Sequence, residues 1–286
     1  MTGSLRIELT GPFAVEPALA ALAAHATPGV ERVDRGGRST TRVLALPSGP
    51  VEVTTVLAAD HLLLVGAFRS AEDRGAAAEL VRRWLDLDAD PVRIEAVLRA
   101  DPLLEPLVDA RPGLRVVGRP DGFEAAVSTV LGQQVSLAAG RTLTGRLVAA
   151  RGEPGPGGLR RFPAPEVLAG LPVEELRAAI GSTVSRARTV RALASAVADG
   201  LSLLPGGDAE RRRRELLALP GIGPWTVEHL EMRAFGDRDA CPAGDLVLRR
   251  ALGMAEAEVR EHARGWRPHR AHAVAHLWAE AAYLQP

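Results

Sequence analysis

Residues 216–226 read LLALPGIGPWT, and this stretch decides the fold of the second half of the chain. An apolar helical segment runs into Pro-Gly-Ile-Gly, and a second helix begins at once. Gly221 and Gly223 allow a tight reversal and let another backbone come close. Pro224 suits the first turn of the following helix. The stretch therefore predicts two helices joined by a hairpin, over about residues 209–235.

The outer end of this hairpin is suited to binding a phosphate group. Backbone N–H groups at a helix start point outward with the positive end of the helix dipole, so they can hold an anion without a basic side chain. The residues expected to contact a DNA backbone at this end are Gly221, Gly223, Pro224 and Thr226, of which Pro224 has no N–H to donate. The inward carbonyls predict a structural Na⁺ or K⁺ on Leu217, Leu219 and Ile222. Such hairpins occur in polymerases, ligases, nucleases and glycosylases, so the element alone does not decide the chemistry. The alternative is a tight turn that binds nothing.

A single acid stands out downstream of the hairpin. Residues 241–250 read CPAGDLVLRR, and Asp245 lies at the start of an apolar-periodic helix about twenty residues after the hairpin. Taken alone, Asp245 reads as a helix N-cap, because aspartate is favoured there. The other acids nearby read as exposed loop or helix-face charges: Glu228, Glu231, Asp237 and Asp239.

Taken together, these motifs give the chain a family resemblance. It resembles the AlkA-type 3-methyladenine DNA glycosylases, DNA-3-methyladenine glycosylase II, within the helix-hairpin-helix DNA glycosylase superfamily. The hairpin followed at this spacing by Pro-x-x-Asp is the superfamily's signature, and its catalytic aspartate falls on Asp245. Residues 123–136, FEAAVSTVLGQQVS, resemble the family's first conserved helix and turn, and residues 270–278, RAHAVAHLW, resemble its closing helix. Residues 1–88 resemble its N-terminal domain in length and order of elements.

The resemblance implies a base-flipping enzyme. A damaged base inside a duplex must be turned out of the stack before it can be cut, and the vacated space needs a plug. The family's plug falls on Gln134. The base pocket implied by the resemblance consists of Trp225, His229, Leu246 and Trp278. Its aromatic rings would favour a cationic alkylated purine through cation–π contact. His229 stands where relatives carry tyrosine, and it reads equally well as a core histidine.

Composition limits the mechanism. All 35 basic residues are arginine, so no lysine can form a Schiff base. With Trp225 at the hairpin position where a lysine would act, we expect a monofunctional enzyme that leaves an abasic site. Cys241 is the only cysteine, which excludes a four-cysteine iron–sulfur cluster, and we expect no cofactor. The start of the chain lacks the apolar stretch of a signal peptide, and no apolar run is long enough to span a bilayer. We expect a cytoplasmic monomer without membrane contact.

Charge is distributed unevenly along a chain whose net charge is zero. Residues 1–112 carry 12 Arg and 16 acids, a net of −4, whereas residues 113–286 carry 23 Arg and 19 acids, a net of +4. The asymmetry fits phosphate contacts in the second part. The candidates are Arg186, Arg188, Arg249, Arg250 and Arg270. The run of arginines at 211–214 reads as a solvated helix face.

The fold class predicted is α+β. Residues 1–88 are expected to form a small antiparallel sheet domain, and residues 89–286 an all-helical core. Alternation of apolar residues predicts strands at 5–9, 41–46, 51–56 and 61–65. Helical periodicity predicts helices at 17–25, 71–87, 122–137, 138–151, 173–180, 186–199, 209–218, 224–235, 245–252 and 267–283. Residues 152–158 read as a flexible loop.

Two other functions remain open on the sequence. One is a helix-hairpin-helix protein that binds distorted double-stranded DNA without catalysis. The other is a glycosylase for oxidised or deaminated bases. Asp245 favours an enzyme, and the aromatic positions favour alkylated purines in base-excision repair.

Overall fold

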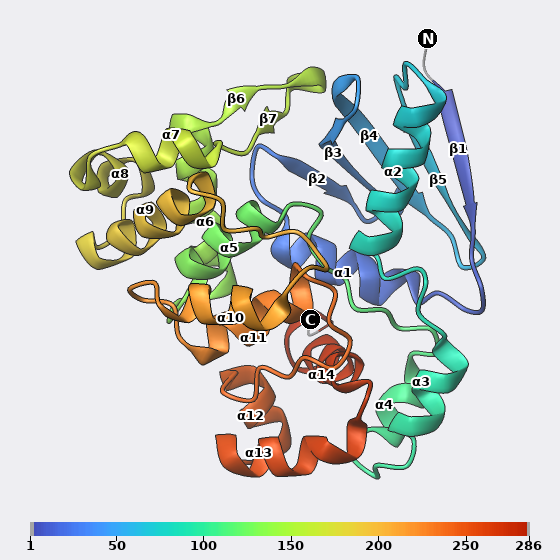
Figure 1. The fold of residues 1–286 in the computed structure, drawn as a ribbon. Coiled ribbons are helices and arrows are strands. Elements are labelled where there is room, and N and C mark those ends of the chain that lie inside the picture. The colour runs from blue at the N-terminus through green and yellow to red at the C-terminus, as the bar shows by residue number, and fades with distance from the viewer. Residues whose placement is uncertain (1–2, 285–286) are drawn as a thin grey trace.

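The computed structural model describes residues 3–284, and it confirms the α+β fold class. The N-terminal part is a five-stranded antiparallel sheet in the order β1-β5-β4-β3-β2 (Figure 1). Its strands are β1 (Gly3–Glu8), β2 (Glu31–Asp34), β3 (Ser39–Leu46), β4 (Gly49–Leu57) and β5 (His61–Gly66). The four strands predicted are confirmed. The edge strand β2, with the sequence ERVD, was not predicted, because it is too short and polar to show alternation.

One face of this sheet forms a core with two helices. Along β4 and β5 every second residue is buried, as expected of a strand with one face packed. Leu62 and Leu64 are fully buried there. The covering helices are α1 (Val15–His25) and α2 (Ala71–Trp84). Ser70 caps α2, since its hydroxyl accepts the Asp73 amide.

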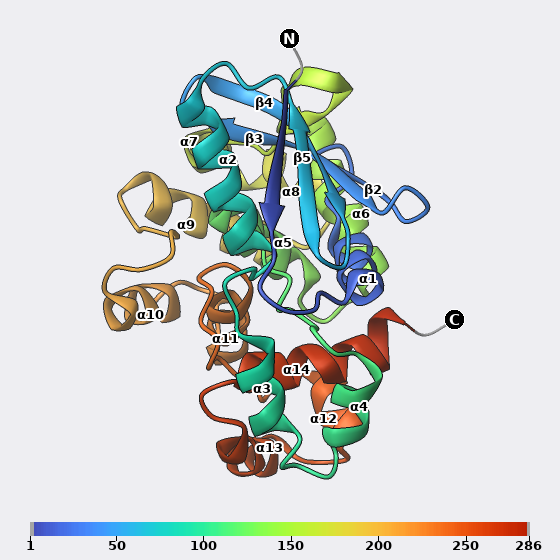
Figure 2. The ribbon, with the colours of Figure 1, turned by 90° about the vertical axis from the view of Figure 1, so that its right-hand side faces the viewer.

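The helical part contains two separate hydrophobic cores. The first is built on α5 (Gly122–Gly132), α6 (Leu137–Arg151), α7 (Pro165–Gly170), α8 (Val173–Ile180), α9 (Val184–Ala198), α10 (Ala209–Leu217) and α11 (Pro224–Arg233). The second joins α3 (Pro91–Leu98) and α4 (Glu105–Ala110) to α12 (Leu246–Leu252), α13 (Glu256–His262) and α14 (Arg270–Trp278). Figure 2 shows α3 and α4 beside these C-terminal helices. Residues far apart in sequence therefore close the second core.

Several helix predictions were wrong in their bounds. The helix predicted over 122–137 ends at Gly132, because Gln134 adopts a left-handed backbone with φ of 56°. The predicted flexible loop forms a short hairpin, β6 (Glu153–Pro154) with β7 (Arg160–Arg161). The closing helix begins at Arg270 and continues as a π-helical turn, Ala279–Tyr283. The short helices α7 and α13 were not predicted. Within residues 3–284, no helix combines the length and apolarity needed to cross a membrane.

A buried ion network fastens the sheet to helix α5. Arg42 on β3 donates to the Glu124 carboxylate at 2.6 Å, and both side chains are almost fully buried. Glu124 also accepts hydrogen bonds from Thr27 at 2.7 Å and from Arg119 at 3.2 Å. Burial raises the pKa of Glu124, but Arg42 and Arg119 outweigh it and hold that pKa below its usual range. Glu124 is therefore ionised, and α5 is fixed relative to the sheet.

Replacing Glu124 by alanine should lower the free energy of unfolding by about 3–5 kcal/mol, because the buried Arg42 would lose its 2.6 Å partner and keep only the 3.6 Å contact with Glu31. Urea denaturation at neutral pH measures the change. Glu79→Ala is the matched control, since Glu79 pairs with Arg83 at the surface and its loss should change stability by about 1 kcal/mol or less. Equal effects of the two substitutions would contradict the assignment of the network as a structural tie.

Candidate active site

The hairpin forms as predicted between α10 and α11. Gly221 has a φ of 79°, which favours glycine, and a Cβ there would lie 2.2 Å from the Thr189 hydroxyl. The Ile222 amide donates to the Leu219 carbonyl at 3.2 Å and closes the turn. A Cβ on Gly223 would meet no protein atom within 4 Å. Gly221 is thus required by the fold, whereas Gly223 leaves an open surface at the start of α11.

Asp245 is held by three donors from three parts of the chain. It is the N-cap of α12, and its Oδ1 accepts the Leu248 amide at 2.9 Å. The same oxygen accepts the indole N–H of Trp278 at 3.0 Å, and Oδ2 accepts that of Trp225 at 3.2 Å. The residue is half-buried. The carboxylate is therefore both a cap and a group fixed in orientation beside two tryptophans.

Three rings next to this carboxylate form one cluster. Trp225 and His229 stack with centroids 5.4 Å apart and planes at 28°. His229 meets Trp278 edge-on at 5.6 Å and 90°. The i, i+4 spacing thus places His229 between the two tryptophans. Leu246 follows the aspartate directly and is 53% exposed, so an apolar side chain stands at the open side of the site.

His229 is a neutral imidazole. Burial, followed by the charges of Arg233 and Arg119, lowers the pKa of His229 to about 3. Both ring nitrogens are buried and have no hydrogen-bond partner among the described residues. The cluster therefore contains a polar ring without charge, whose donor and acceptor are both unused.

The turn between α5 and α6 carries the predicted plug and is tied to the hairpin. The side-chain amide of Gln133 donates to the Gly221 carbonyl at 3.0 Å and to the Thr226 hydroxyl at 2.9 Å. Gln134 is exposed and points from a left-handed backbone position. Thr226 is buried, so its predicted contact with DNA is left to its backbone amide. The turn and the hairpin thus form one surface.

Of the four rival acids, only Asp237 is exposed as predicted, and the other three are buried or partly buried and paired with arginine. Glu228 is buried and pairs with Arg260 at 2.7 Å. Glu231 accepts two hydrogen bonds from Arg213, each 2.7 Å long. Asp239 pairs with Arg267 and Arg270. The exposed Asp237 accepts the Asp239 amide. These partners occupy three of the four carboxylates with arginine and leave Asp245 as the acid beside the aromatic cluster.

The candidate phosphate contacts divide into two groups. Within residues 3–284, Arg188, Arg249 and Arg250 form no ion pair, and Arg250 is exposed. Arg186 donates to the Gln133 carbonyl at 2.6 Å and so supports the turn that carries Gln134. Arg270 pairs with Asp239 through two hydrogen bonds, which makes it a structural residue instead. The run at 211–214 is not a solvated face throughout, since Arg212 is buried over the Phe235 ring.

Sequence reasoning missed the residues behind the aromatic cluster. His25 of α1 and Tyr283 of the C-terminal π-turn share a 2.8 Å hydrogen bond between Nε2 and the hydroxyl. Arg233 is buried as well, and its charge acts on both Tyr283 and His25. No pattern in the sequence signals the first contact, because 258 residues separate its partners.

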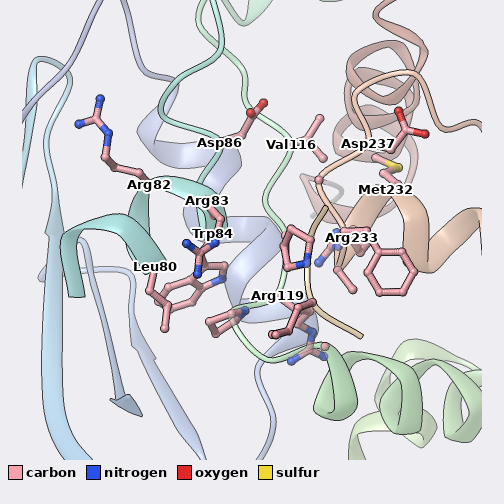
Figure 3. Close-up of a pocket in the computed structure, with 18 of the residues that line it drawn as sticks. Leu80, Arg82, Arg83, Trp84, Asp86, Val116, Arg119, Met232, Arg233 and Asp237 are labelled. Atoms are coloured by element: carbon pink, nitrogen blue, oxygen red, sulfur yellow. The ribbon is translucent and has the colours of Figure 1, made fainter. Parts of the chain in front are cut away.

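A cavity of about 430 Å³ lies elsewhere, at the end of α11 remote from the hairpin. Figure 3 shows Arg82, Arg83 and Trp84 on one wall and Met232 and Arg233 on the other. Its outer arginines are paired with acids, as in Arg82 with Asp88 and Arg238 with Asp86. The cavity does not contain Asp245, so it does not mark the candidate active site.

The cation expected on the carbonyls of Leu217, Leu219 and Ile222 stays a prediction. The Leu219 carbonyl accepts the Ile222 amide, which leaves one lone pair on that oxygen for an ion. Cys241 is buried, and burial raises its pKa to about 11, so it is an unreactive thiol.

The fold and the site define a helix-hairpin-helix protein with an N-terminal sheet domain. Residues 4–121 match the AlkA N-terminal domain family, and residues 127–264 match the HhH-GPD superfamily of base excision DNA repair proteins. The chain is 34% identical over 206 residues to DNA-3-methyladenine glycosylase 2 of Escherichia coli, covering 68% of each chain. It belongs to the AlkA-type 3-methyladenine DNA glycosylase family within that superfamily, as the sequence motifs indicated.

One further relative agrees with this membership, and one solved structure shares the fold. A probable bifunctional transcriptional activator/DNA repair enzyme AlkA of Mycobacterium tuberculosis is 42% identical over 287 residues, covering 97% of this chain and 57% of that protein. The chain thus spans little more than half the length of this relative. A 3-methyladenine DNA-glycosylase from Archaeoglobus fulgidus has the same fold, with a TM-score of 0.85, 23% identity and coverage of 98% and 100%.

Two glycine substitutions separate folding from ligand contact. Gly221→Ala should destabilise the protein by about 1 kcal/mol or more, because of its positive φ and the clash with Thr189. Gly223→Ala should leave thermal stability unchanged and weaken binding to a DNA duplex, because its Cβ points into open space where a phosphate would lie. Thermal melts and fluorescence anisotropy measure the two effects. Unchanged DNA affinity for Gly223→Ala would contradict the hairpin as a phosphate site.

The neutral state of His229 has a signature in pH dependence. With the pKa lowered to about 3, the folded protein binds no proton at His229 where the unfolded chain does, below about pH 6.5. The free energy of unfolding is therefore unaffected by His229 above about pH 6.5. It decreases as the pH falls from 6.5 toward 3, because the unfolded chain gains a proton there and the folded protein does not. In NMR spectra, the His229 ring signals should stay unshifted between pH 5 and 8, with His229→Phe assigning them. A midpoint near pH 6.5 would contradict this prediction.

Proposed function

We propose that this protein is a monofunctional DNA glycosylase that excises alkylated purines, of the 3-methyladenine and 7-methylguanine type, in base-excision repair. The observation that supports it most is the Asp245 carboxylate, oriented by two indole N–H groups beside a hairpin suited to DNA. The names of the relatives at 34% and 42% identity point to the same activity. The substrate is double-stranded DNA with a damaged base.

Binding would begin at the hairpin and the neighbouring turn. The start of α11 offers backbone N–H groups to a phosphate, and Arg249 and Arg250 add charge on the next helix. Gln134 would enter the stack that the everted nucleotide leaves, where an amide can fill space and hydrogen-bond the orphaned base. Because Gln133 joins its own turn to the hairpin, the plug and the phosphate grip would act as one rigid unit.

Asp245 would stabilise the positive charge that develops on the sugar. As the bond from C1′ to the base nitrogen breaks, its electron pair leaves with the base and the sugar becomes cation-like. A fixed carboxylate lowers the energy of that state without having to reorganise. The same group can orient water or accept its proton as water adds to C1′. The products are a free base and an abasic site, and without lysine the strand stays uncut.

The aromatic cluster would select the base. An alkylated purine with a positive charge is attracted to the face of Trp225, which is partly exposed, whereas Trp278 is 5% exposed and acts through its N–H on Asp245. The neutral state of His229 matters here, because a protonated imidazole between the two tryptophans would repel such a base. We still predict that the protein needs no cofactor, is a monomer and acts in the cytoplasm.

The substitution Asp245→Asn separates catalysis from capping. Asparagine caps a helix as well as aspartate does, so the fold and the DNA affinity should persist. The charge is lost, and release of 3-methyladenine from methylated DNA should fall by at least about a hundredfold. Chromatography of the released base measures the rate.

The matched control is Asp208→Asn, because Asp208 is the N-cap of α10 and accepts the Arg211 amide in the same way. This variant should excise at the wild-type rate. If Asp245→Asn also kept the wild-type rate, Asp245 would be a cap and nothing more. If the wild-type protein released only oxidised or deaminated bases from a mixed panel of lesions, the substrate assignment would be wrong.

A further inference from the structure

Helix α14 is held at both ends by the N-terminal domain. Before its middle, the fully buried His272 bonds through Nε2 to the Asp86 carboxylate at 2.9 Å, just past the end of α2. Beyond its C-terminal end, Tyr283 bonds to His25 of α1. Figure 2 shows α1 directly above this end of α14. The position of α14 along its axis is therefore set by residues of a different domain.

Contacts continue from His25 to the candidate catalytic carboxylate. The His25 ring meets Tyr283 edge-on at 5.4 Å, and Tyr283 meets Trp278 at 6.5 Å. Trp278 is 5% exposed, and its indole N–H donates to Asp245 at 3.0 Å. Each ring in this series contacts the next, and Trp278 is the one that hydrogen-bonds the Asp245 carboxylate.

We propose that His25 and Tyr283 are positioning residues for Asp245, acting through Trp278, so that the N-terminal sheet domain is part of the catalytic unit. The inference rests on the proposed function, because it assumes that Asp245 acts on the sugar. It gives the N-terminal domain a role that neither the hairpin nor the base pocket supplies.

The chemistry of the contact suits a fixed support. Burial raises the pKa of Tyr283, so its hydroxyl is neutral. Burial, and then the charges of Arg233, Arg119 and Arg141, lower the pKa of His25 well below its usual value. Because the His25 ring is neutral, one of its nitrogens can accept the proton of the Tyr283 hydroxyl. A neutral pair of this kind does not loosen when the pH changes around neutrality.

Loss of the support should affect the rate of the chemical step more than binding. Tyr283 lies outside the hairpin and the plug, so affinity for undamaged duplex DNA does not depend on it. If Trp278 shifts, Asp245 loses one of its two donors on Oδ1 and the carboxylate can turn. A misplacement of about 1 Å at a reacting group lowers a rate by up to about a hundredfold.

The test measures single-turnover base release and duplex affinity in four variants of the full chain. Tyr283→Phe removes only the hydroxyl and should lower the rate about ten- to a hundredfold with affinity unchanged. His25→Ala should do the same, and His25→Gln, whose amide can still accept the hydroxyl, should recover most of the rate. His262→Ala is the control, because it removes a 2.7 Å hydrogen bond to Asp101, remote from the site, and should keep the wild-type rate.

A second arm excludes general loosening of the fold. In the Asp245→Asn background, adding Tyr283→Phe should change the residual rate by less than about twofold, because both changes remove the same contribution. Wild-type rates in Tyr283→Phe and His25→Ala would overturn the inference and leave the proposed function intact. An equal rate loss in His262→Ala would also overturn it, and so would an equal effect of Tyr283→Phe in the wild-type and Asp245→Asn backgrounds. A wild-type protein that releases no base would instead refute the proposed function.

Discussion

The carboxylate of Asp245 is the point at which the separate parts of this molecule meet. It caps α12, accepts one indole from the hairpin helix and accepts another from α14. A cap requires only the first of these bonds. The two indoles tie the carboxylate to the element that would grip DNA and to the helix that the N-terminal domain holds. A displacement of any of the three elements would turn the acid away from its present direction.

The electrostatic surroundings of Asp245 differ from those of the other acids. The chain is neutral overall, and most of its acids are engaged by arginine, including Glu228 and Glu231 beside the hairpin. Close to Asp245 the pattern changes: indoles and an uncharged imidazole surround it, and His229 has no partner of its own in the described residues. A lone negative charge among neutral rings suits the stabilisation of a developing positive charge, because the carboxylate accepts only neutral N–H donors among residues 3–284.

The sequence predicted those features that are local. The hairpin depends on Gly221 and Pro224, the sheet on alternation within single strands, and the cap at Asp245 on the residues that follow it. The stacking of His229 on Trp225 follows from their spacing on one helix. The contacts that were missed join distant residues: Arg42 to Glu124, Asp86 to His272 and His25 to Tyr283. Nothing near His25 in sequence distinguishes it from a polar helix end, and Arg212 read as exposed because its burial depends on Phe235. Tertiary packing, not local pattern, decides such positions.

The most direct test of the central claim is a crystal structure with duplex DNA that carries a pyrrolidine analogue of the abasic sugar. The protonated ring nitrogen of that analogue stands where positive charge develops as the base leaves. The account predicts an everted analogue with this nitrogen about 3–3.5 Å from an Asp245 carboxylate oxygen, which still accepts at least one indole N–H. An analogue bound in the groove with its ring away from Asp245, or held by another acid, would contradict it.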